Sequence, residues 1–98
     1  MIVRLVKMIF KPDKMNDFDK IFDDSKEKIK SFDGCLSLEL LRSGKEPNVY
    51  FTYSKWESEE KLENYRSSEL FILTWSDTKI LFQEKPEAYS LNSLFLAE

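Results

Sequence analysis

The stretch VYFTYSKWESEE, residues 49–60, contains the change from strand to helix that decides the fold. Its first part, Val49 to Trp56, is rich in aromatic and β-branched residues, which favour strands. Ser58 has a side chain that commonly caps a helix N-terminus. Glu59 and Glu60 then place negative charge in the first helical turn, where the helix dipole favours it. The stretch therefore predicts a strand followed directly by a capped helix.

The residues before this stretch predict a second strand that pairs with the first. Leucines at every second position of Cys35–Arg42 give this segment an apolar face, as expected of a half-buried strand. The polar segment Ser43–Asn48 contains Gly44 and Pro47 and reads as a turn. A turn of this length between two strands predicts an antiparallel hairpin.

The residues after the stretch predict more helix and a final strand. The helix that begins near Glu59 is interrupted or re-capped at Ser67–Ser68, and a helical pattern of apolar residues continues over Glu69–Phe82. Lys85–Pro86 is expected to end this helix, because proline cannot continue it. Ala88–Leu96 is then predicted as the last strand.

The N-terminal third predicts one strand and one amphipathic helix. Ile2–Phe10 is largely apolar on both faces, which is typical of a strand covered on two sides. Pro12 suits the first turn of a helix, and apolar residues then recur at intervals of three and four positions as far as Phe32. Gly34 is expected to end the helix in a left-handed conformation.

The resulting order β-α-β-β-α-β predicts an α+β, ferredoxin-like fold with an antiparallel sheet and both helices on one face. We expect residues 1–98 to form a single domain. The helices would cover one side of a first strand that is apolar on both sides. A second copy is therefore expected to cover the other face, giving a homodimer with its sheets face to face, as in a dimeric α/β barrel.

Composition excludes several classes of function. The net charge of −3 and the absence of a basic stripe argue against nucleic acid as a partner, and no apolar run approaches the length needed to cross a membrane. The chain contains no histidine and only two glycines, which excludes catalytic triads, histidine metal sites and phosphate loops. Cys35 is the only cysteine, and we expect its thiol to be inert. We also expect the chain to have no signal peptide and to be located in the cytoplasm.

Several segments together resemble the antibiotic biosynthesis monooxygenase domain family. They are Phe10–Pro12, Phe32–Cys35 and Tyr53–Glu60, followed by Leu62, Tyr65, Ser68 and Phe71. The resemblance covers nearly the whole chain and implies the fold of the dimeric α/β barrels. The family includes cofactor-independent oxygenases of phenols and quinols, haem-degrading enzymes and proteins of unknown role.

The haem-degrading branch of this family can be compared position by position. It uses an asparagine, a tryptophan and an iron-binding histidine, which align with Val6, Tyr65 and Trp75 of this chain. All three residues differ, so the resemblance does not imply haem degradation. It implies instead an oxidoreductase that needs no metal and no cofactor.

Four residues are candidates for a ligand pocket: Val6, Trp56, Tyr65 and Trp75. The aromatic ones either fill the core or surround a cavity in which a small aromatic substrate stacks. The leading hypothesis is a monooxygenase acting on a small aromatic such as a quinol, with its catalytic residues unknown. The alternative is a non-catalytic dimer that binds a small hydrophobic ligand. Glu39, in the middle of a strand, is expected to form an ion pair with Arg4 or Arg42 or to act as a general base.

Overall fold

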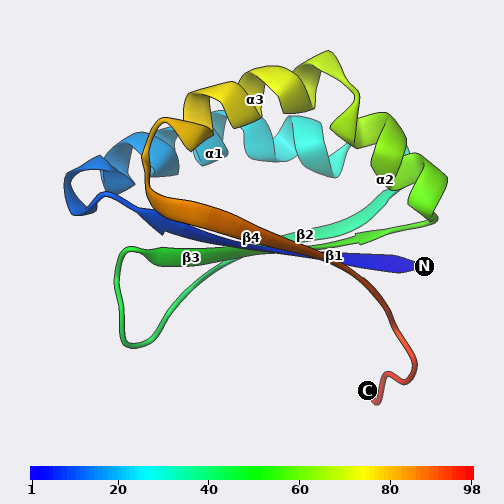
Figure 1. Cartoon of the computed structure of the whole chain (residues 1–98). Coiled ribbons are helices and arrows are strands. Elements are labelled where there is room, and N and C mark those ends of the chain that lie inside the picture. The colour runs from blue at the N-terminus through cyan, green and yellow to red at the C-terminus, as the bar shows by residue number, and fades with distance from the viewer.

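The computed structural model describes residues 1–98. Its elements are β1 (Ile2–Phe10), the 3-10 turn η1 (Pro12–Lys14), α1 (Met15–Lys30), β2 (Cys35–Arg42), β3 (Val49–Trp56), α2 (Glu59–Arg66), α3 (Glu69–Lys79) and β4 (Phe82–Asn92). The three α-helices lie together on one face of the sheet, and the other face carries no helix (Figure 1). This arrangement confirms the predicted ferredoxin-like α+β fold. No helix reaches the length and apolarity required for a membrane span.

The sheet has the strand order β2-β3-β1-β4, and every neighbouring pair is antiparallel. Successive residues of a strand point to opposite faces, so the even-numbered residues of β1 face the helices and the odd-numbered residues face away. In β2 the register shifts at Leu36, which is exposed, contrary to its predicted place on the apolar face. Leu38 and Leu40 keep that place because the bulge lies before them.

Two serines begin the helices that follow β3. Ser58 Oγ accepts a hydrogen bond from the backbone N–H of Lys61 at 3.2 Å, and Ser68 Oγ accepts one from Phe71 at 3.2 Å. The prediction that the Ser67–Ser68 pair re-caps a new helix is therefore confirmed at Ser68. The break between α2 and α3 brings Tyr65 and Phe71 together, with ring centroids 5.2 Å apart.

Gly34 occupies the turn between α1 and β2. The helix ends at Lys30, and Gly34 then adopts a φ of 92°, in the left-handed region that favours glycine. A Cβ atom at this position would collide with the side chain of Lys61 in α2. Asp33 also accepts a hydrogen bond from Lys61 Nζ at 2.6 Å, so the turn packs tightly against the start of α2.

The C-terminal boundaries differ from the prediction. The helix ends at Lys79, and the last strand is Phe82–Asn92 in place of residues 88–96. Lys85–Pro86 lies inside this strand, where the register against β1 shifts. Proline, which has no backbone N–H to donate, is tolerated because β4 is an edge strand and the extra residue of the bulge is unpaired in the ladder.

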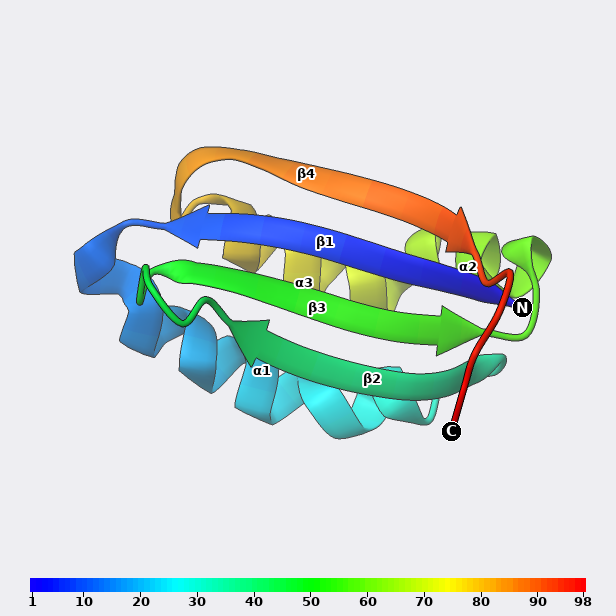
Figure 2. The same cartoon turned by 90° about the horizontal axis from the view of Figure 1, so that it is seen from below.

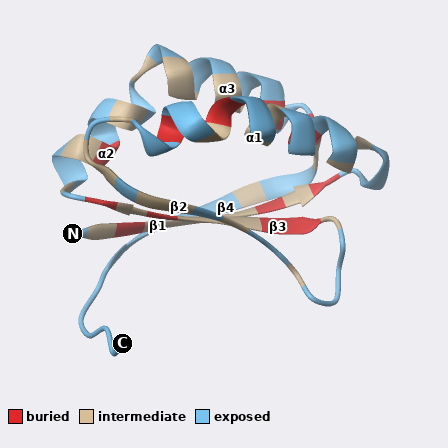
Figure 3. Ribbon diagram, turned by 180° about the vertical axis from the view of Figure 1, so that it is seen from behind, coloured by how far each residue is buried: buried red, intermediate tan, exposed pale blue.

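Side chains pack together between the helices and the sheet where β1 ends and β3 begins. We call this part of the molecule the closed end. It consists of Met8, Phe10, Phe18, Tyr50 and Leu81. Phe10 is 0% exposed, and its ring centroid lies 4.4 Å from that of Phe18. Figure 3 shows buried segments where the helices meet the sheet and exposed ones on the outer sides of the helices.

The helix-free side of the sheet, which we call the open face, is apolar along its middle. Leu5 pairs with Tyr53 of β3 and Tyr89 of β4, and Leu41, Tyr89 and Leu91 are exposed. The segment after β4 passes across this face (Figure 2), and its Phe95 is 86% exposed. A broad apolar surface therefore faces solvent in the single chain.

Candidate functional site

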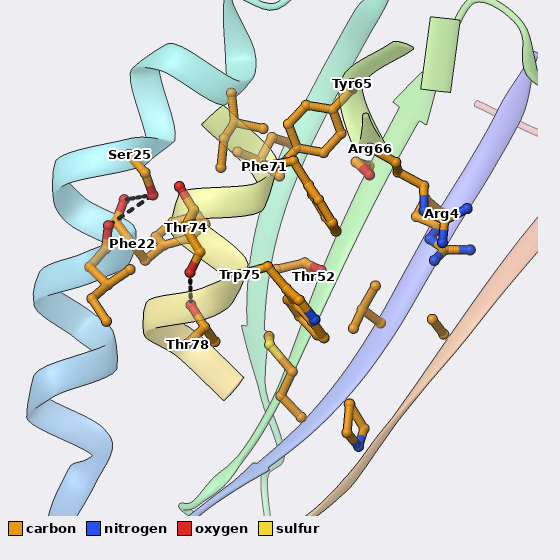
Figure 4. Close-up of a pocket in the computed structure, with 18 of the residues that line it drawn as sticks. Arg4, Phe22, Ser25, Thr52, Tyr65, Arg66, Phe71, Thr74, Trp75 and Thr78 are labelled. Carbon is orange, nitrogen blue, oxygen red and sulfur yellow. Dashed lines mark hydrogen bonds between the residues drawn. The ribbon is translucent and has the colours of Figure 1, made fainter. Parts of the chain in front are cut away.

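A cavity of about 300 Å³ lies between the helices and the covered face of the sheet, beside the closed end (Figure 4). The strands form its floor, and α1, α2 and α3 form its walls. Arg66 and Ala88 line it and are exposed, so the cavity reaches solvent at their end. A volume of this size is at the lower end of the range for small-molecule sites.

The floor of the cavity changes from polar to apolar along β1. Arg4 lies beside Ser54 on β3 and Ser90 on β4. The next inward-facing pair is Val6 and Thr52, and Met8 follows at the closed end. A ligand in this cavity would therefore meet donors at one end and hydrocarbon at the other.

The helical wall is aromatic along its length. Tyr65 stacks on Trp56 with centroids 4.8 Å apart, and Phe71 stacks on Trp75 at 5.9 Å. Trp75 then contacts Phe82 edge to face at 5.5 Å, which joins the wall to the closed end. Stacked and edge-to-face rings of this kind offer both geometries that aromatic ligands prefer.

Tyr65 presents a phenol with no hydrogen-bond partner in the chain. Burial raises the pKa of Tyr65 well above its ordinary value, and the negative charge of Cys35 in its thiolate form adds to the increase. Tyr65 therefore stays protonated at physiological pH and can donate a hydrogen bond but cannot serve as a base. Burial likewise raises the pKa of Cys35, in keeping with the expected unreactive thiol.

Two guanidinium groups converge on the polar end of the cavity. Arg4 comes from β1 and Arg66 from the last turn of α2, and both line the cavity (Figure 4). Burial lowers the pKa of Arg4, and the positive charge of Arg66 lowers it further. Arg4 Nη1 donates to Ser90 Oγ at 2.9 Å, and Arg66 Nη1 lies 2.8 Å from Glu63 Oε1.

Two other hydroxyl groups of the lining form hydrogen bonds within their own helices. Ser25 Oγ donates to the carbonyl of Ile21 at 2.8 Å, and Thr78 Oγ1 donates to that of Thr74 at 2.7 Å. These bonds hold the hydroxyls against the backbone (Figure 4), so the α1 side of the cavity contributes little polarity.

All four residues predicted for the pocket line the cavity: Val6, Trp56, Tyr65 and Trp75. Trp56 is 1% exposed, and its indole N–H donates to Ser54 Oγ at 3.0 Å. It is thus a core residue with one surface on the cavity, whereas Tyr65 and Trp75 are half-buried. Their binding of a substrate stays a prediction.

Arg4 and Arg66 were not among the residues predicted for the site, yet both line the cavity. The signal at Arg4 was present: it is the charged residue among Ile2, Val6, Met8 and Phe10 on the helix-facing side of β1. Arg66 carries no comparable signal, because a basic residue in the last turn of a helix is common.

The ion pair expected for Glu39 is not formed, and its role as a general base stays a prediction. Glu39 is exposed and pairs with Tyr53 in the β2–β3 ladder, so it points to the open face. Arg4 points to the covered face, and neither Arg4 nor Arg42 forms an ion pair with Glu39. The alternation of side chains across the sheet separates the two charges.

Comparison with known proteins connects this geometry to a family. The family model described as antibiotic biosynthesis monooxygenase matches residues 1–73. No curated protein matches the sequence significantly.

Solved structures resemble the fold closely at low sequence identity. A crystal structure of an antibiotic biosynthesis monooxygenase has a TM-score of 0.90 and 15% identity, covering 96% of this chain and 99% of that chain. A protein of Mycobacterium tuberculosis has a TM-score of 0.90 and 18% identity, covering 99% of this chain and 98% of that chain. A protein of Caulobacter crescentus named for the same activity has a TM-score of 0.89 and 24% identity, covering 96% and 90%. At these identities the likeness shows the fold alone.

Proposed function

The chain belongs to the antibiotic biosynthesis monooxygenase family, and from this we propose that it is a cofactor-independent monooxygenase of a small aromatic substrate such as a quinol or anthrone. The observation that carries the proposal is the aromatic-walled cavity of about 300 Å³ with its positively charged end. Stacking on Tyr65, Phe71 and Trp75 would orient a planar ring against the floor.

The proposed chemistry fits a cavity whose lining contains no histidine, cysteine or carboxylate. An electron-rich phenol or anthrone first loses a proton to solvent, and the resulting anion passes an electron to O₂. For an aromatic methylene the net reaction converts CH₂ and O₂ into C=O and water, and the substrate supplies every electron. The charge of Arg4 would favour the anion, and the aromatic wall would exclude water.

Oxygen consumption tests this proposal. We expect the protein to consume O₂ with at least one member of a panel of anthrones and quinols faster than the substrate autoxidises in buffer. Phe71→Ala should lower that rate severalfold because it removes part of the cavity wall. Ile72→Ala, at the neighbouring exposed position, should leave the rate unchanged. A rate equal to autoxidation with every substrate would exclude the enzymatic function.

A binding protein is the second candidate, and the absence of an acid–base group from the lining favours it. In that case the cavity would hold a small hydrophobic ligand without converting it. Quenching of tryptophan fluorescence by an anthrone, together with O₂ consumption at the autoxidation rate, would identify this function. Quenching together with faster O₂ consumption would identify the enzyme.

We also propose that the chain works as a homodimer joined through the open face. The support is the apolar middle of that face, where Leu41, Tyr89 and Leu91 are exposed. Lys7 lies beside Glu87 on the same face, so a second copy related by two-fold symmetry could match the charges as well. Sedimentation should give twice the mass of the chain, and a monomer at micromolar concentration would refute the dimer.

A further inference from the structure

The positively charged end of the cavity carries more cationic groups than the chain neutralises. Arg66 pairs with Glu63, whose side chain is 55% exposed. Arg4 is half-buried, and its one protein partner is the neutral hydroxyl of Ser90. Two neighbouring guanidinium groups thus share a single carboxylate, and the remaining positive charge lies at the entrance to an apolar cavity.

A neutral hydroxyl beside this charge can donate a hydrogen bond to a ligand. Ser54 is 6% exposed, and its Oγ accepts from the Trp56 indole, which leaves its own O–H available to donate. Tyr65 also lines the cavity, further along the aromatic wall. A hydroxyl donor beside two guanidinium forks is suited to an oxyanion, and a planar carboxylate matches the guanidinium best.

We propose that the cavity takes an aromatic carboxylate, with its carboxylate bound by Arg4 and Arg66 and its ring inserted between the aromatic wall and Val6. This inference names the substrate class for the proposed oxygenase and rests on that function, but it concerns binding and is tested without turnover. The floor sets the orientation, because polarity falls from Arg4 through Val6 to Met8. The reacting ring would then lie near Trp75, away from the entrance.

A pair of probes of nearly the same shape isolates the charge. Binding of 2-naphthoate and of its neutral amide, 2-naphthamide, is measured by calorimetry at pH 7.5. We expect the acid to bind at least tenfold more tightly, in line with about 1.5 kcal/mol or more for a hydrogen bond to a charged group. Equal affinities, or no binding of the acid, would overturn the inference.

Substitutions then locate the charge. Arg66→Gln and Arg4→Gln should each weaken binding of the acid about tenfold and leave that of the amide within twofold. Lys45→Gln, in the exposed hairpin turn beyond the closed end, removes the same charge and should change neither. If Lys45→Gln weakened binding of the acid as much as the arginine substitutions do, net charge would explain the effect. The assignment of the carboxylate to Arg4 and Arg66 would then be wrong. Arg66 is exposed, so its variant gives a result even if Arg4→Gln fails to fold.

The outcome for this inference is separable from that for the proposed function. Selective binding of the acid, lost on substitution of the arginines, supports the inference even if no substrate drives O₂ consumption. Conversely, turnover of neutral anthrones without preference for an acid would retain the oxygenase and remove the carboxylate.

Discussion

The two ends of the helix–sheet layer are both built from aromatic residues, yet one is solid and the other hollow. At the closed end Phe10, Phe18 and Tyr50 pack within 5.5 Å of one another and are almost fully buried. At the cavity end Tyr65 and Trp75 are half-buried around empty space. Aromatic content therefore does not distinguish core from site in this fold.

The floor beneath the two ends explains the difference. Under the closed end the inward-facing residues of β1 are Met8 and Phe10, which fill the layer. Under the cavity the inward-facing residues are Arg4 and Val6, one of which extends toward solvent and the other of which is short. The break at Ser67–Ser68 adds to this, because α2 and α3 meet there above the floor in place of one continuous helix.

The largest test of this comparison is the stability cost of an aromatic residue at each end. Phe10→Ala should lower the free energy of unfolding by about 3–5 kcal/mol, because it empties a closed core. Trp75→Ala should cost about 2 kcal/mol, because its ring already borders a cavity and solvent. Urea denaturation measures both, and Phe10→Leu serves if the alanine variant does not fold. Equal costs at the two positions would mean that both ends are core.

The next test concerns the turn that supports the cavity end. Gly34→Ala should cost about 2 kcal/mol, because the position has a positive φ and the added Cβ meets Lys61. Gly44→Ala provides the matched control, since a Cβ there meets nothing within 4 Å, and it should change stability by less than about 0.5 kcal/mol. If Gly34→Ala left the free energy of unfolding unchanged, the start of α2 would be able to shift, and this turn would not fix the cavity wall.

A smaller effect is expected from Ser54, which joins the core to the site. Ser54→Ala should cost about 1–2 kcal/mol, because it leaves the buried Trp56 indole N–H without its acceptor. Ser54→Thr keeps the hydroxyl and should recover most of the loss. Denaturation curves of the two variants compare them directly. If alanine and threonine behave alike, the hydrogen bond contributes nothing and only side-chain volume matters at this position.

The fold was predictable because its signals are local and repeated. The alternating leucines of β2, the cap at Ser58 and the aromatic strand Val49–Trp56 each specify one element, and their order specifies the sheet. The last strand was misplaced because Phe82 continues a helical spacing while pairing with Phe10 in the ladder. That pairing is a long-range contact, and local spacing carries no information about it.

The cavity was only half predictable for the same reason. Val6, Trp56, Tyr65 and Trp75 were identified through a resemblance to a family, and all of them line the cavity. The Arg4–Arg66 pair joins a strand to a helix sixty-two positions later, and nothing in the sequence near either residue indicates the other. Charge at a ligand site is set by such distant neighbours, whereas apolar periodicity is set by the element itself.

The smallest effect expected is a change in how stability responds to alkali, and it tests whether Tyr65 belongs to the hollow end or to the core. The pKa of Tyr65 is raised in the folded chain, so between the unfolded value of about 10 and the folded value the native state holds the proton more tightly. Stability is therefore fully present below about pH 10 and falls as the pH rises above it. Tyr65→Phe should reduce that fall, while at pH 7 it should change the free energy of unfolding by well under about 1 kcal/mol, because the hydroxyl has no partner in the chain. Urea denaturation at pH 7 and above pH 10 measures both quantities. A variant with an unchanged alkaline response would mean that water reaches the Tyr65 phenol freely, and the hollow end would then be more open than the half-buried ring indicates.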